Sequence, residues 1–201
     1  MKKIKVPDCI CQLKMIDHDK IKDRVLSEIS KSFDELIPKS NDDSYYVDSI
    51  SRLDWNQALD LERPWVKIVL PNFRISITEF LTECGYNDIK LNQMWYQQYE
   101  EGDQHGWHIH GCHYTGVYYL EYPKGSAKTE VCSPYNLKSQ KIEDVEEGDI
   151  IIFPAHWIHR GLENGKDRKT IVSYNLDIDA DRLLNTELVN SVNTGKPYIF
   201  F

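Results

Sequence analysis

Residues 107–122 read WHIHGCHYTGVYYLEY, a run rich in the aromatic and β-branched side chains that favour extended backbone. Four other runs share this composition and are separated by Gly, Pro and Asp turns: 89–99, 130–132, 149–153 and 168–178. Several short strands in succession predict an antiparallel sandwich or barrel.

Helices are expected before these strands. An amphipathic helix is predicted over residues 19–33, where apolar side chains recur every four residues: Ile21, Val25, Ile29 and Phe33. A second helical stretch is expected over 64–84, kinked or divided at Pro71 because proline removes a helix hydrogen bond. Residues 4–14 alternate weakly, as in an entry strand, and the polar segment 38–48 is expected to be a surface connection.

The length of 201 residues suits one domain. We expect helical support over about 1–88, a barrel core over about 89–178 and a C-terminal tail over 179–201. A hydrophobic content of 41% supports a packed core and argues against disorder. The net charge of −8 disfavours nucleic acid as a partner, because the phosphate backbone would be repelled.

A cytoplasmic location is expected. No apolar run approaches the roughly 20 residues that span a bilayer, so no membrane partner is predicted. The basic start, MKKIKVP, is not followed by the apolar segment of a signal peptide. The five cysteines are odd in number and scattered, which favours reduced thiols.

Six of the seven histidines fall between positions 105 and 159. Side chains alternate along a strand, so His108 and His110 are expected on one face and to grip a metal ion from two points. His159, after the buried run 150–154, is the expected third ligand, and three protein ligands with open positions suit a catalytic metal. For the remaining histidines we expect surface or core positions without a special role: His18, His105, His113 and His156. The alternative for His113 and His156 is a contact with the substrate or with the metal ligands.

An arginine follows the last of these ligands by nine residues. Arg168 and Thr170 share a strand face by alternation, and a guanidinium beside a hydroxyl can hold a carboxylate in two parallel bonds. An exposed arginine that pairs with Asp167 or Glu163 is the equal alternative. Trp95, Trp107 and Trp157 are expected to pack in the core or to form an apolar wall of the site.

Residues 94–178 resemble the 2-oxoglutarate/iron(II) dioxygenase superfamily, in particular its prolyl-4-hydroxylase-like branch and the small bacterial and phage oxygenases. The matching motifs follow the family order and spacing: Tyr99-Glu100-Glu101-Gly102, His108-Ile109-His110, Gly116-Val117-Tyr118-Tyr119-Leu120, Gly148-Asp149, Phe153-Pro154 to His159, and Arg168-Lys169-Thr170. The resemblance implies an α+β, mainly β fold: a double-stranded β-helix, or jelly-roll barrel, flanked by N-terminal helices.

The resemblance also implies site residues and cofactors. His108 and His159 correspond to family ligands of Fe(II). Arg168 and Thr170 occupy positions that bind the distal carboxylate of 2-oxoglutarate. Tyr119 matches a tyrosine that bonds the same carboxylate, and Tyr99 matches one that approaches the co-substrate near the metal.

One position departs from the family pattern, because His110 stands where a carboxylate is expected. A working three-histidine site is the favoured interpretation. Asp103 or a water molecule in the third position, and a catalytically impaired site, are the alternatives.

The implied activity is oxidation of a C–H bond, by hydroxylation or otherwise, with O2 and 2-oxoglutarate. The substrate would be a small molecule or a peptide, and the acidic surface favours a peptide or amino-acid side chain over nucleic acid. Two alternatives stay open: a cupin-type three-histidine metal dioxygenase that does not use 2-oxoglutarate, and an inactive jelly-roll binding module.

Overall fold

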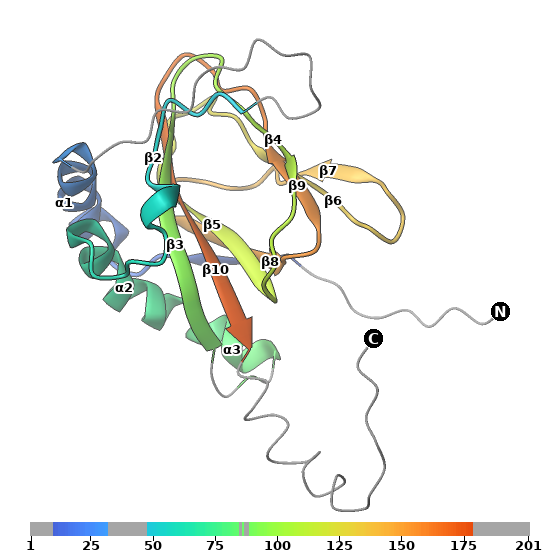
Figure 1. The fold of residues 1–201 in the computed structure, drawn as a ribbon, viewed down its shortest axis with the longest axis horizontal. Helices are drawn as coiled ribbons and strands as arrows, with labels where there is room; N and C mark the ends of the chain where they lie inside the picture. The colour runs from blue at the N-terminus through green and yellow to red at the C-terminus, as the bar shows by residue number, and fades with distance from the viewer. Residues whose placement is uncertain (1–9, 32–47, 85, 87–88, 179–201) are drawn as a thin grey trace, which may run out of the picture.

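The computed structural model describes residues 10–31, 48–84, 86 and 89–178, which form a mainly β fold with helices on one side (Figure 1). The larger sheet has six strands in the order β1 (Cys11–Lys14), β8 (Asp149–Pro154), β5 (Tyr114–Glu121), β10 (Lys169–Ile178), β3 (Ile89–Tyr99) and β2 (Arg52–Leu53). The smaller sheet has the order β4 (His105–His108), β9 (Ile158–Gly161), β6 (Thr129–Cys132) and β7 (Ser139–Lys141). Every neighbouring pair is antiparallel, as in the predicted jelly roll.

Three helices cover the outer face of the larger sheet: α1 (His18–Lys31), α2 (Pro64–Ser76) and α3 (Thr78–Cys84). The predicted apolar face of α1 is confirmed for Ile21, Val25 and Ile29, which are buried, whereas Phe33 lies outside the described residues. These side chains join a cluster with sheet residues such as Tyr118. Apolar burial between helices and sheet is therefore the main support of this layer.

A second apolar cluster fills the space between the two sheets. It contains Val117, Tyr119, Ile151 and Ile171 from the larger sheet, and Val131 from the smaller one. Because side chains alternate along a strand, the even-numbered neighbours of these residues on β5, β8 and β10 face the helices. These strands are thus covered on both faces, which explains their near-continuous burial.

The second helical stretch divides at Ile77, whereas Pro71, where a kink or a division was predicted, lies inside a continuous α2. The backbone N–H of Ile77 bonds the carbonyls of Phe73 and Ile75 where the helix ends. A short 3-10 helix, η1 (Trp55–Gln57), follows β2. The break between α2 and α3 therefore follows the proline, at a position with no proline or glycine signal.

Gly116 marks a close approach of two strands. A Cβ atom built on Gly116 would lie 1.9 Å from the carbonyl oxygen of Ile151 and 2.3 Å from the hydroxyl of Tyr174. That hydroxyl donates to the same Ile151 carbonyl over 2.6 Å. Only glycine leaves room for this bond across the middle of β5.

The predicted strand at 89–99 is confirmed, whereas the run 107–122 separates into β4 and β5 with a loop between them. The entry strand is confirmed over Cys11–Lys14. The polar segment at 38–47 and the tail at 179–201 lie outside the described residues. Among the helices that are described, none is long and apolar enough to cross a membrane.

Candidate metal centre and adjoining cavities

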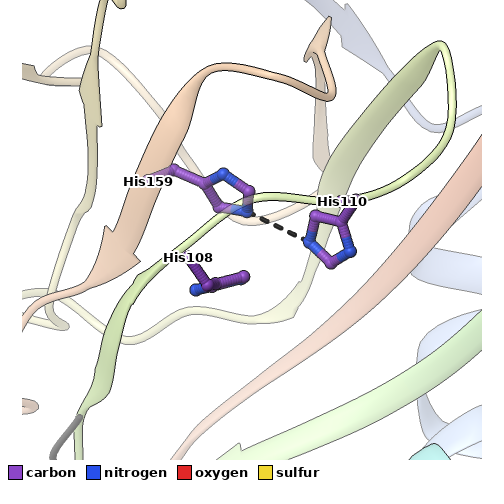
Figure 2. Close-up of side chains that lie close together, drawn as sticks. All are labelled: His108, His110 and His159. Atoms are coloured by element: carbon purple, nitrogen blue, oxygen red, sulfur yellow. Dashed lines mark hydrogen bonds between the residues drawn. The ribbon is translucent and has the colours of Figure 1, made fainter.

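His108, His110 and His159 lie at one end of the space between the sheets (Figure 2). His108 is the last residue of β4 and pairs in register with His159 on β9. His110 lies in the loop beyond β4, where its backbone N–H donates to the carbonyl of Ala155 over 3.0 Å. The prediction that both early histidines share one strand was therefore wrong, although the loop still brings His110 to the cluster.

The ring nitrogens of the three histidines are arranged as metal ligands would be. Nδ1 of His108 lies 2.7 Å from the carbonyl oxygen of Gly106, and Nδ1 of His159 lies 2.9 Å from that of Trp157. A carbonyl only accepts, so each Nδ1 carries the proton and each Nε2 presents its lone pair to the cluster. One candidate nitrogen from each ring falls within 4.8 Å of the others.

The spacing of two of these nitrogens fits one metal ion. Nε2 of His110 and Nε2 of His159 are 3.2 Å apart. Two nitrogens bound at about 2.1 Å, with an angle between octahedral and tetrahedral values, would be roughly 3.0–3.4 Å apart. The donor set and its spacing therefore fit a divalent first-row metal such as iron.

Burial keeps the cluster uncharged. It lowers the pKa of His108 and takes that of His159 well below the usual value, and burial together with His108 lowers the pKa of His110 to about 4. Neutral imidazole is the form that binds metals, so all three rings are ready as ligands at pH 7.

The alternative third ligand, Asp103, lies elsewhere. Its carboxylate accepts from the backbone N–H groups of Ser51 and Glu100 and from the Ser51 hydroxyl. It therefore holds the turn after β3 to the residues before β2. Within the described residues, the candidate metal group consists of three imidazoles.

A small inner chamber of about 30 Å³ extends from the histidines between the sheets. Tyr99, Thr129 and Lys169 belong to its lining. Lys169 is 2% exposed; its ammonium group donates to the carbonyl of Ala127 over 3.2 Å and lies 4.2 Å from the centre of the Tyr99 ring. Burial lowers its pKa to about 7, and no carboxylate of the described residues pairs with it.

Arg168 and Thr170 do not face this chamber. Arg168 donates from Nε and one terminal nitrogen to the two carboxylate oxygens of Glu121, over 3.0 and 3.1 Å, and its side chain is 44% exposed. Thr170 donates to the same carboxylate over 2.7 Å and accepts from Gln98. Because neighbours on a strand point to opposite faces, this placement directs Lys169 inward. The arginine does pair with a carboxylate, but neither Asp167 nor Glu163 provides it.

The two tyrosines named from the sequence lie on the inner side. Tyr99 lines the chamber directly. Tyr119 is buried, and its hydroxyl shares a hydrogen bond of 2.8 Å with the hydroxyl of Thr129, which also lines the chamber. Burial raises the pKa of both tyrosines, so both remain protonated hydrogen-bond donors.

A larger outer cleft of about 270 Å³ opens on the other side of the histidines. It shares with the inner chamber the residues Trp95, Gln97, His105, His108 and His110. Its remaining walls come from Asp48, Ile50, Leu53, Trp55 and Ile109. The histidine cluster thus borders both the inner chamber and the outer cleft.

His105, for which no role was predicted, is part of the site. Its ring stacks on that of His108 with centroids 3.9 Å apart, and its Nδ1 lies 3.4 Å from the side-chain nitrogen of Gln97. Strict alternation along a strand would place His105 on the face of Trp107 and away from His108, so the sequence did not predict this stack. The stack depends on the irregular pairing of β4 with β9 between His105 and His108. Trp107 instead lies under the Arg160 guanidinium.

The other histidines and tryptophans lie as expected. His18 bonds the hydroxyl of Tyr118, His113 bonds Asp177, and His156 is exposed beside Tyr135. Trp157 packs in the inner cluster, whereas Trp95 lines both cavities.

No family model and no curated protein matches this sequence. Solved structures do match it. An oxidoreductase of the 2OG-Fe(II) oxygenase family from Burkholderia pseudomallei is 12% identical, with a TM-score of 0.62 and 84% of each chain covered. The fold is that of the 2-oxoglutarate/iron(II) oxygenases.

Two prolyl hydroxylases share this fold. The collagen prolyl hydroxylase of Paramecium bursaria Chlorella virus-1, solved with 2-oxoglutarate, is 18% identical (TM-score 0.54, covering 83% of this chain and 94% of that one). The prolyl hydroxylase of Trichoplax adhaerens, solved with a peptide of hypoxia inducible factor, is 14% identical (TM-score 0.58, covering 89% and 87%). At these identities the similarity concerns the fold, and the site must be argued from its own residues.

Proposed function

We propose that this chain is an iron(II)- and 2-oxoglutarate-dependent dioxygenase that oxidises a C–H bond of a small molecule or peptide. The proposal rests on two features that lie in adjoining cavities, a histidine cluster and a buried lysine. Three neutral imidazoles converge at the junction of the cavities, and one buried ammonium without a carboxylate partner, that of Lys169, lines the inner chamber.

His108, His110 and His159 would hold the metal. His108 and His159 are oriented by hydrogen bonds to backbone carbonyls, so their Nε2 atoms point at a common position. When bound, iron and 2-oxoglutarate supply the oxygen chemistry, and the chain supplies ligands, orientation and shelter. Three neutral ligands leave the charge of the metal less compensated than two histidines and a carboxylate would.

Lys169 would bind the distal carboxylate of 2-oxoglutarate. A buried cation without a counter-ion is costly, and a carboxylate that enters the chamber removes this cost. Tyr99 and Thr129 line the same chamber and offer hydroxyl groups, and Tyr119 orients the Thr129 hydroxyl. This proposal replaces Arg168 and Thr170, whose side chains are engaged with Glu121.

The inner chamber must enlarge to admit the co-substrate. A volume of about 30 Å³ holds about two water molecules. We expect the Lys169 ammonium to leave the Ala127 carbonyl and turn toward the incoming carboxylate, because its four-carbon side chain is flexible.

A three-histidine metal dioxygenase without 2-oxoglutarate is the second candidate. His110 in place of a carboxylate favours it, because three histidines depart from the set of two histidines and one carboxylate that is typical of non-haem iron(II) oxygenases. The Lys169 ammonium favours the first candidate, because a reaction without a dicarboxylate has no use for it. The substrate is proposed as a peptide or amino-acid side chain, on the structural similarity to prolyl hydroxylases.

Titration of the purified full-length chain tests the proposal. Mn(II) should bind with one ion per chain, and 2-oxoglutarate should then bind to the Mn(II)-loaded protein, measured by calorimetry without oxygen. Succinate should form when Fe(II), 2-oxoglutarate and O2 are supplied. Metal binding without 2-oxoglutarate binding would favour the second candidate, and failure to bind either would leave a binding module.

A further inference from the structure

The two cavities beside the histidines carry opposite charge. The inner chamber has Lys169 and Arg160 in its lining, and Arg160 is paired with Glu130. The described lining of the outer cleft contains one carboxylate, that of Asp48, and neither lysine nor arginine. An anion is therefore favoured on the inner side and a cation on the outer side.

Asp48 is held in place at the cleft. Its carboxylate accepts from the backbone N–H of Gly106 over 2.8 Å and lies 3.7 Å from Nε2 of His105. The side chain of Asp48 is 37% exposed and remains open to a ligand.

Apart from Gln97 and the histidines, the rest of the cleft wall is apolar and partly aromatic. Trp55 is 42% exposed and Ile109 is 58% exposed, so both present apolar surface at the cleft. The indole of Trp55 meets that of Trp95 edge to face, with centroids 4.5 Å apart. Indole faces attract cations and also cover aliphatic chains.

We propose that the primary substrate carries a cationic nitrogen on an aliphatic chain, as lysine-type side chains and alkylamines do. The aliphatic chain lies against Trp55, Ile109 and Trp95, and the cationic nitrogen pairs with Asp48 while a C–H bond faces the histidine cluster. This rests on the proposed function and specifies its substrate class. A volume of about 270 Å³ is small for a ligand pocket and suits one side chain or a free amino acid.

A matched pair of probes tests the charge preference: Nα-acetyl-lysine methylamide and its uncharged analogue Nα-acetyl-norleucine methylamide. Their affinities are measured by tryptophan fluorescence or NMR titration of the metal-free full-length chain. The lysine probe should bind about tenfold more tightly, since it adds an ion pair and a cation–π contact to the same apolar area. Equal affinities, absence of binding by the lysine probe, or tighter binding of Nα-acetyl-proline methylamide would overturn the proposal.

Three variants test which residues cause the preference for the charged lysine probe. Asp48→Asn keeps an oxygen acceptor for Gly106 but removes the charge, and it should reduce the preference to about twofold or less. Trp55→Leu should weaken the lysine probe more than the norleucine probe, because leucine keeps apolar surface but no π face. Asp144→Asn removes the same charge at an exposed position remote from the cleft lining and should leave the preference unchanged.

This design distinguishes failure of the substrate-class proposal from failure of the proposed function. Mn(II) and 2-oxoglutarate affinities are measured separately on the same proteins. Loss of the charge preference with intact Mn(II) and 2-oxoglutarate binding would refute only the substrate class. A preserved charge preference in a chain that binds no 2-oxoglutarate would refute only the proposed function.

Discussion

Nε2 of His110 and Nε2 of His159 lie 3.2 Å apart, although the first belongs to a loop and the second to a strand of the smaller sheet. Two lone pairs at this distance repel each other unless a proton or a cation lies between them. The Nδ1 atom of His159 already carries its proton toward the carbonyl of Trp157. A proton on Nε2 of His110 or a shared metal ion accounts for this spacing, and the metal predictions test the second.

His159→Ala should lower Mn(II) affinity by about 100-fold or more, since loss of a direct ligand costs at least as much as loss of an outer partner. His113→Ala is the control, because His113 bonds Asp177 at the surface and should leave Mn(II) binding unchanged. Calorimetry and metal analysis measure the difference. Unchanged affinity in His159→Ala would exclude the centre.

His110→Asp should bind Mn(II) about tenfold more tightly, because a carboxylate cancels part of the metal charge in a poorly solvated site. The variant should fold normally, since His110 is outside the strand ladders. Loss of metal in this variant would mean that the geometry requires an imidazole, and no change would mean that His110 is not a ligand.

Lys169→Met should weaken binding of 2-oxoglutarate to the Mn(II)-loaded chain by about 10- to 100-fold, because charge-assisted hydrogen bonds contribute about 1.5–3 kcal/mol. The same variant should stabilise the ligand-free chain by about 1–4 kcal/mol, because it removes a buried cation without a counter-ion. Calorimetry and urea unfolding measure the two effects. A lysine with only a structural role would give destabilisation instead.

Arg168→Ala is the matched variant, at the residue directly before β10. It should change 2-oxoglutarate affinity less than about twofold and stability by about 0–1 kcal/mol, because it breaks a partly exposed pair with Glu121. A 2-oxoglutarate defect in Arg168→Ala with normal binding in Lys169→Met would restore the assignment suggested by the sequence.

The stability of the ligand-free chain should rise with pH above about 7. Burial lowers the pKa of Lys169 to about 7, whereas the unfolded side chain titrates near 10.4. Between these values the unfolded state binds one proton more than the folded state, so unfolding becomes less favourable as pH rises, by up to about 1.4 kcal/mol per pH unit. Urea unfolding at pH 7, 8 and 9 should show this rise in wild type and a smaller one in Lys169→Met.

Gly116→Ala should destabilise the fold by about 3 kcal/mol or more, since its Cβ would meet the backbone carbonyl of Ile151 at 1.9 Å. Gly111→Ala is the control: no atom lies within 4 Å of a Cβ built at Gly111, and a change of less than about 1 kcal/mol is expected. Urea unfolding measures both. Equal stability of the two variants would contradict the close approach of β5 and β8.

The sequence predicted the elements that depend on local pattern. The strand at 89–99 was confirmed from its composition and the buried face of α1 from its apolar spacing, and both are local properties of the sequence. Convergence of His108, His110 and His159 was also predicted, from their spacing and from a family resemblance. Their role as metal ligands stays a prediction.

The face of β10 that turns inward could not be read from the sequence. Arg168 and Lys169 are adjacent, and either could serve a carboxylate until the register is known. The register of Ile171 with Tyr119 across β10 and β5 directs the odd-numbered residues inward, and this pairing joins segments 52 residues apart. Asp48 and His105 were missed for the same reason, since the cleft assembles from β3, β4 and the segment before β2.

His110 lies in a loop, so it can be substituted with less effect on the fold than His108 or His159. His108 and His159 are bound into paired strands, so a change at either would disturb both the ladder and the centre. His110 contributes through one side chain and one backbone bond to Ala155. A single substitution at position 110 can therefore change the net charge of the centre with little effect on the stability of the barrel. We expect the metal preference of this fold to be altered most readily at this position.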